Sequence, residues 1–145
     1  MPMEDPTGAD AISYALSTTV HEPFAAVLHR VRQALADQGF GVLTEIDIAA
    51  TFKAKLDVEV PPQVILGACN APLAREGLRV EPDLGLLLPC NVVVRLDADG
   101  STVVAAVNPE MMVTATGQPG LEPVAAGAGA RLRRVLDSVA GPAAV

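Results

Sequence analysis

Residues 86–108, LLLPCNVVVRLDADGSTVVAAVN, contain the strongest fold signal in the chain. Two apolar runs rich in β-branched residues, 86–96 and 102–108, indicate two strands. The segment between them, DADG at 97–100, is typical of a tight turn, so the two runs are expected to form a hairpin. Pro89 cannot donate a ladder hydrogen bond, which predicts a bulge, an edge position or a late strand start there. The backbone is therefore expected to be irregular near Cys90.

Helices and strands alternate in the part of the chain that precedes this hairpin. Asp47 and Asn70 are side chains that commonly cap helix N-termini, and Pro72 suits the first turn after Asn70. The spacing of apolar residues predicts, in order, a strand over 12–20, a helix from Pro23 that stops at Gly39, a strand over 40–46, a short helix after Asp47, a strand over 63–68 and a helix over 71–80.

The part of the chain that follows the hairpin is expected to hold a loop and one long helix. Residues 110–120 lack a clear period and are rich in Thr, Gly and Met, which predicts a loop. Apolar residues return to helical spacing over 121–139. Gly127 and Gly129 each cost about 1 kcal/mol relative to alanine, so the first half of this helix is expected to fray or to lie close against the sheet.

The length and the order of elements together indicate one domain. The chain has 145 residues, which suits a single hydrophobic core. The predicted order, roughly β-α-β-α-β-α-β-β-α, places it in the α+β class. Residues 1–10 are interpreted as a flexible leader, 11–140 as a single α+β domain and 141–145 as a tail.

Charge and composition disfavour several classes of partner. The formal net charge is −7, which repels phosphate backbones, and aromatic residues form only 3% of the chain, so we expect no nucleic-acid partner. No apolar run reaches the roughly 20 residues of a membrane span, and no signal peptide is evident, so we expect no membrane partner and a cytoplasmic protein. The two cysteines are then expected to be reduced thiols.

Two Cys-Asn pairs, Cys69-Asn70 and Cys90-Asn91, are the residues most suggestive of chemistry. Cys69 stands directly before a predicted helix, and a helix N-terminus stabilises a thiolate. Cys90 belongs to a predicted strand that could lie beside the strand ending at Cys69. The two thiols and two amides are therefore candidates for a site that binds a small, unidentified ligand, because asparagine both donates and accepts hydrogen bonds.

A soft metal ion is an alternative ligand for the same site. Two thiolates could bind Cu(I), together with a thioether from Met111 or Met112, because soft ligands select soft metals. Structural zinc usually takes four Cys or His ligands, and no such set is present. The identity of any metal or cofactor remains open at this point.

Two further interpretations compete with ligand binding. Cysteine often serves as a small buried apolar residue, in which case the protein is a structural or interaction module that works as a homodimer, through a sheet edge or through residues 110–120. A thiol-dependent enzyme would need a base beside Cys69, and His21 and His29 are the only histidines. Both histidines are expected to be solvated, so enzymatic activity is uncertain.

Three segments resemble a family of bacterial and archaeal proteins, the domain-of-unknown-function family number 302. These segments are GFGVLTEID at 39–47, LGACN at 66–70 and LLPCNVVV at 87–94. Their order and spacing also match, and the resemblance covers about residues 12–139. The family typically has proline directly after the first Cys-Asn pair, whereas Ala71 stands there in this chain.

The resemblance implies a fold but no reaction. The fold expected from it is a curved, largely antiparallel sheet with helices packed on one face, and a tendency to form homodimers. Both motifs that contain Cys69 and Cys90 carry the resemblance, which draws attention to these two residues without assigning a role to them.

Overall fold

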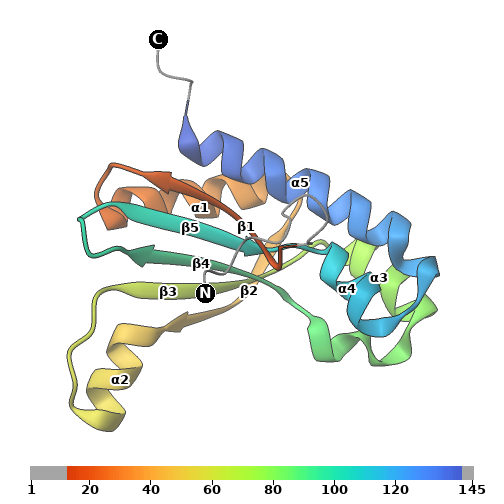
Figure 1. The fold of residues 1–145 in the computed structure, drawn as a ribbon, viewed down its shortest axis with the longest axis horizontal. Helices are drawn as coiled ribbons and strands as arrows, with labels where there is room; N and C mark the ends of the chain where they lie inside the picture. Colours follow the sequence, from red (N-terminus) through yellow and green to blue (C-terminus); the bar gives the residue numbers. More distant parts are fainter. Residues whose placement is uncertain (1–12, 142–145) are drawn as a thin grey trace, which may run out of the picture.

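The chain forms an open, five-stranded antiparallel sheet with helices, as the α+β prediction required (Figure 1). The computed structural model describes residues 13–141. Along the sheet the strands follow the order β1-β5-β4-β3-β2. Their bounds are Ala15–Val20 for β1, Gly41–Asp47 for β2, Gln63–Cys69 for β3, Cys90–Leu96 for β4 and Thr102–Val107 for β5.

The described residues also contain five α-helices and two short 3-10 helices, of which α4, η2 and α5 follow the last strand. The α-helices are α1 (Phe24–Asp37), α2 (Ile48–Leu56), α3 (Ala71–Val80), α4 (Glu110–Thr116) and α5 (Glu122–Ala140), and the 3-10 helices are η1 (Pro82–Leu87) and η2 (Pro119–Leu121). Asp47 and Asn70 cap α2 and α3 as predicted. None of the helices within residues 13–141 combines the length and the apolar character that crossing a membrane requires.

The buried residues form two neighbouring clusters. The main core lies between the sheet and helices α1 and α5, where alternate residues of the central strands, such as Leu66, Val92 and Val104, are fully buried. A second cluster lies where α3, η1 and α4 gather beside the first half of α5, and it contains Leu84 and Met112. The ends of β3 and β4 meet between these two clusters.

The structure corrects two predictions near these strand ends. Residues 110–120 are not a loop, because they form α4, which ends at Gly117 with φ 68°, followed by η2. The strand expected over 86–96 starts only at Cys90, because residues 82–87 form η1 and Pro89, after a cis peptide bond, precedes the first ladder pair. A late strand start was one of the three outcomes that Pro89 predicted.

The long helix is continuous over 122–140 and does not fray at its glycines. A Cβ atom on Gly127 would lie 3.3 Å from Cδ2 of Leu73, so this glycine allows α5 to pack closely on α3. The expectation of fraying or of close contact with the sheet is therefore wrong at Gly127, where the neighbour is helix α3.

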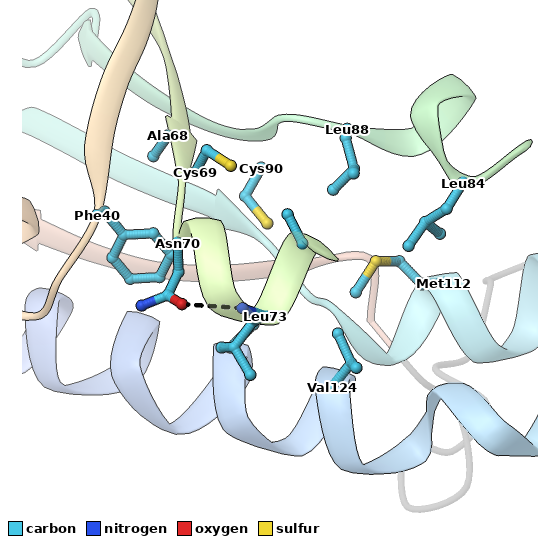
Figure 2. A pocket seen from close by; sticks show the side chains of 12 residues that line it. Phe40, Ala68, Cys69, Asn70, Leu73, Leu84, Leu88, Cys90, Met112 and Val124 are labelled. Carbon is cyan, nitrogen blue, oxygen red and sulfur yellow. Dashed lines mark hydrogen bonds between the residues drawn. The ribbon is translucent and has the colours of Figure 1, made fainter. Parts of the chain in front are cut away.

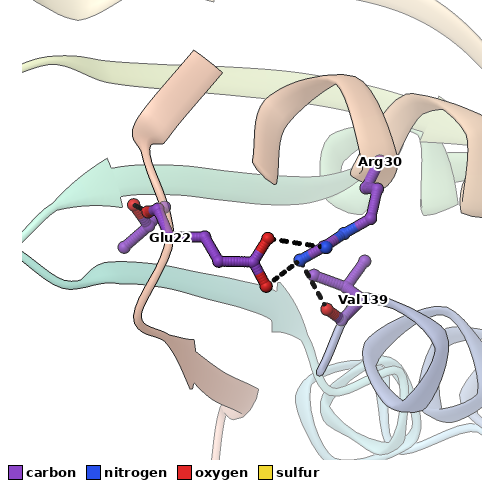
Figure 3. A network of polar contacts seen from close by, with 4 residues as sticks. Glu22, Arg30 and Val139 are labelled. Atoms are coloured by element: carbon purple, nitrogen blue, oxygen red, sulfur yellow. Dashed lines mark hydrogen bonds and ion pairs between the residues drawn. The ribbon is translucent and has the colours of Figure 1, made fainter. Parts of the chain in front are cut away.

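A polar network joins the two helices of the main core to the end of β1 (Figure 3). The Arg30 guanidinium on α1 donates to both carboxylate oxygens of Glu22, at 2.9 and 3.2 Å, and to the Val139 carbonyl of α5 at 3.0 Å. The Arg30 and Glu22 side chains are 38% and 45% exposed, so the ion pair contributes at most about 1 kcal/mol to stability. The bond to Val139 satisfies one carbonyl in the last turn of α5.

Candidate functional site

Pairing of β3 with β4 brings the two cysteines together. Ala68 and Cys90 are partners in the antiparallel ladder, and Cys69 is the last residue of β3. Cys90 is the first residue of β4. Figure 2 shows the Cys69 side chain pointing toward Cys90, with both sulfur atoms at the same end of the sheet. Both cysteines are free thiols.

Both thiols line one small cavity at the junction of the two core clusters. Its volume is about 20 Å³, which is enough for about one water molecule. The main core contributes Phe40 and Ala68 to the wall, and the second cluster contributes Leu84, Met112 and Val124. The remaining lining residues are Cys69, Asn70, Leu73, Ala74, Leu88, Cys90 and Ala128. The surroundings of the thiols are therefore almost entirely apolar.

The two thiols differ in burial. Cys90 is 6% exposed, whereas Cys69 is half-buried. Burial raises the pKa of the Cys90 thiol from 9.0 to about 11, and the neighbouring Cys69 thiol contributes a smaller increase. At neutral pH Cys90 is consequently a neutral thiol and a poor nucleophile. A metal ion that replaces its proton could still convert it to a thiolate ligand.

Asn70 fixes the position of the chain directly after Cys69. Its side-chain oxygen accepts a hydrogen bond from the Leu73 backbone N–H at 3.1 Å, which caps α3 (dashed in Figure 2). Its side-chain nitrogen donates to the Gly39 carbonyl at 3.2 Å. Gly39 has φ 83°, a conformation that favours glycine, and so permits the turn between α1 and β2 that presents this carbonyl. Both ends of the Asn70 amide are thus already engaged in structural contacts.

Asn91 lies away from the cavity. It follows Cys90 in β4, where successive side chains point to opposite faces of the sheet, and it is exposed. It is not among the lining residues. The structure therefore brings Cys69, Asn70 and Cys90 together and leaves Asn91 on the other face.

The cavity offers sulfur ligands but no general base. None of its lining residues is His, Asp or Glu, and within residues 13–141 no three His, Cys, Asp or Glu side chains gather closely enough to hold a metal ion. His21 and His29 are both exposed. Met112 supplies a third sulfur across the cavity from the cysteines (Figure 2). This combination suits ligation by sulfur better than thiol catalysis, which needs a nearby proton acceptor.

The sequence patterns did not mark Phe40, Leu73 or Leu84 as site residues, although all three also form the cavity wall. Phe40 lies directly before β2, whereas Leu73 and Leu84 lie on the consecutive helices α3 and η1. Their apolar periodicity indicates only that each faces a core, so no local signal could have assigned them to one cavity.

Comparisons with known proteins identify a family without a described activity. The family model with the description "Domain of unknown function DUF302" matches residues 16–139. A solved structure, the crystal structure of uncharacterized conserved protein DUF302 from Bacillus stearothermophilus, is similar with a TM-score of 0.81 and 28% sequence identity. That similarity covers 88% of this chain and 98% of the Bacillus chain. No curated protein matches the chain.

Proposed function

The chain belongs to the DUF302 family, and we propose from the geometry of its own thiol cavity that it binds one Cu(I) ion between Cys69 and Cys90. Met112 is the proposed third ligand, because it lines the same cavity and its unbranched side chain can change rotamer to approach the thiols. The observation that carries the proposal is the placement of three sulfur side chains around a space of about 20 Å³.

The size of the cavity favours an ion over an organic ligand. Pockets for small organic molecules typically enclose about 300–1,000 Å³. The space between the thiols is more than tenfold smaller, at about 20 Å³, so a metabolite would require the core to rearrange. A single metal ion replaces two thiol protons and is small enough for a space that holds about one water molecule.

The ligand set favours Cu(I) over zinc. Structural zinc takes four ligands, usually Cys and His, whereas this cavity supplies two thiols and one thioether. Thiolate and thioether sulfurs are soft donors that select Cu(I). Two thiolates and one Cu(I) carry a net charge of −1, and the N-terminus of α3, which begins two residues after Cys69, stabilises negative charge.

Anaerobic titration of the reduced protein with Cu(I), in competition with a chromophoric Cu(I) chelator, tests the proposal. We expect the protein to take one Cu(I) per chain from the chelator and to develop a near-ultraviolet charge-transfer band from sulfur to copper. Bound Cu(I) should also protect both thiols from alkylation, whereas Zn(II) at the same concentration should not. The proposal is wrong if the chelator retains all of the copper and the alkylation rates do not change.

A second candidate function, that of a homodimeric module, is favoured by exposed apolar residues on β2 and α2. Leu43 is 66% exposed, Ile46 46% and Leu56 64%, and α2 has no buried residue. In Figure 1, α2 lies beyond the β2 edge of the sheet, away from α1 and α5. Leu43 occupies a register shift in β2, which disfavours strand pairing between copies, so the interface would use these side chains.

Replacing Leu43 and Leu56 with serine is expected to weaken the dimer by more than about tenfold in Kd, because burial of each leucine side chain contributes about 1.5–3 kcal/mol that serine cannot supply. Light scattering after size exclusion measures the molar mass over a dilution series. Leu86→Ser is the matched control, because Leu86 is 85% exposed but lies on η1, and this variant should remain dimeric. A wild-type mass of 14.9 kDa at every concentration would exclude this candidate.

A further inference from the structure

A second and larger apolar cavity adjoins the thiol cavity on the side of α4. Its volume is about 200 Å³. It is lined by residues of η1, β4, β5 and α4 and of the turn before α4, namely Leu87, Cys90, Val107, Pro109, Met111, Met112 and Ala115. Cys90 and Met112 line both cavities, so the two cavities are neighbours; we call the larger one the outer cavity and the thiol cavity the inner cavity.

The sulfur side chains of the two cavities form a graded series. Met111 is half-buried and lines only the outer cavity, Met112 is 6% exposed and lines both, and Cys69 lines only the inner one. A thioether is a neutral donor that binds soft metals without releasing a proton, whereas a thiol must lose its proton to become a strong ligand. The outer cavity therefore holds two thioethers and one thiol, Cys90, whereas the inner cavity holds one thioether and two thiols.

We propose that the outer cavity is the route by which Cu(I) enters and leaves the thiol pair, and that Met111 is the first ligand on that route. This inference rests on the proposed function and adds a path and a ligand to it. The outer cavity has ten times the volume of the inner one, at about 200 against 20 Å³, so it can admit the ion together with a departing donor group.

Each step along the route is a ligand exchange without a change in oxidation state. Cu(I) first bonds to the Met111 sulfur as the donor group of a delivering chelator departs. The Met112 sulfur then replaces Met111, and the thiols of Cys69 and Cys90 replace the remaining donor groups of the chelator, each releasing one proton to water. The reverse sequence returns the ion to an external acceptor and returns both protons to the thiols.

Substituting Met111 with leucine tests whether Met111 binds Cu(I) only along the route or also in the final site. A group used only on the route changes entry and exit equally, so M111L should slow both rate constants by about tenfold and change Kd by less than about twofold. Ala115→Phe should slow exchange in the same way, because it narrows the outer cavity without removing a sulfur. Thr114→Ala, at an exposed position of α4, is the matched control and should change neither quantity.

Stopped-flow exchange with a chromophoric Cu(I) chelator gives the rates, and the equilibrium titration gives Kd. If the wild-type protein takes up no Cu(I), both the proposed function and the route are wrong. If it binds Cu(I) but M111L and A115F exchange at the wild-type rate, the route alone is wrong, and the ion then enters past the half-buried Cys69. If M111L weakens Kd as strongly as it slows exchange, Met111 is a ligand of the bound state and the route is likewise overturned.

Discussion

Replacing Cys90 with serine is expected to weaken Cu(I) binding by more than about 100-fold, because loss of a group that only orients a metal ligand already costs about 10–100-fold. Cys90 is the more deeply buried thiol and lines both cavities, so a hydroxyl in its place leaves Cys69 and the Met112 thioether as the remaining soft donors. A hydroxyl oxygen is a hard donor with little affinity for Cu(I). The competition titration with a chromophoric chelator measures the loss directly.

Three companion variants make this result interpretable. Cys90→Ala removes the sulfur without burying a hydroxyl, which guards against a fold defect from an unsatisfied polar group. Cys69→Ser should reduce affinity to a similar extent. Asn91→Ala is the control, because Asn91 adjoins Cys90 in sequence but lies outside the cavity. Equal Cu(I) affinity in all four variants, with unfolding temperatures close to wild type, would show that neither cysteine binds the ion.

Local sequence signals were sufficient to place each thiol at the end of a strand, but they left open whether the two strands are neighbours. Asn70 and Pro72 together specify where α3 begins, and they therefore also mark the end of β3 at Cys69. Apolar β-branched runs specify β3 and β4, and the two strands pair as neighbours. Adjacent strand ends then bring Cys69 and Cys90 to one place, although the pattern could not show that Asn91 faces away.

The helix α4 was missed because it is too short to display an apolar period. It has seven residues, EMMVTAT, and its apolar residues form no clear stripe. A signal was nevertheless present at its start, since the Asn108 side chain accepts a hydrogen bond from the Glu110 N–H at 3.1 Å. The order Asn108-Pro109-Glu110, followed by Gly117, is a start and stop pattern for a helix. Greater weight on these termini would have predicted α4.

The cavity itself could not be predicted from local patterns. Its wall combines Phe40, which precedes β2, with Leu84 of η1 and Met112 of α4, and these residues meet only after the two clusters pack together. On sequence grounds Met111 and Met112 are equal candidates for a third sulfur ligand. Their separation into the outer and inner cavities depends on the orientation of α4, which follows from tertiary packing.

The paired ends of β3 and β4 depend on a glycine that no sequence pattern singled out. Gly67 lies two residues before Cys69 and is buried between β2 and the start of β4. A Cβ atom at this position would overlap Oγ1 of Thr44 and would lie 2.8 Å from Cγ of Pro89. The Thr44 hydroxyl can move by a change of rotamer, but the Pro89 ring is rigid and directly precedes β4, so relieving this contact would shift the start of β4.

Gly67→Ala is therefore expected to lower the free energy of unfolding by about 2–3 kcal/mol, the upper part of the range for overpacked cores. For a chain of this size that corresponds to a fall in Tm of roughly 5–10 °C. Because Pro89 directly precedes Cys90, the same displacement should also weaken Cu(I) binding. Denaturant and thermal unfolding measure the first effect, and the chelator titration measures the second.

Gly85→Ala is the matched control, because no neighbouring heavy atom lies within 4 Å of a Cβ atom there, and its stability should stay within about 0.5 kcal/mol of wild type. A Gly67→Ala protein as stable as Gly85→Ala would show that β2 and β4 can separate at this point, and the close strand packing that we infer to position the two thiols would then be wrong.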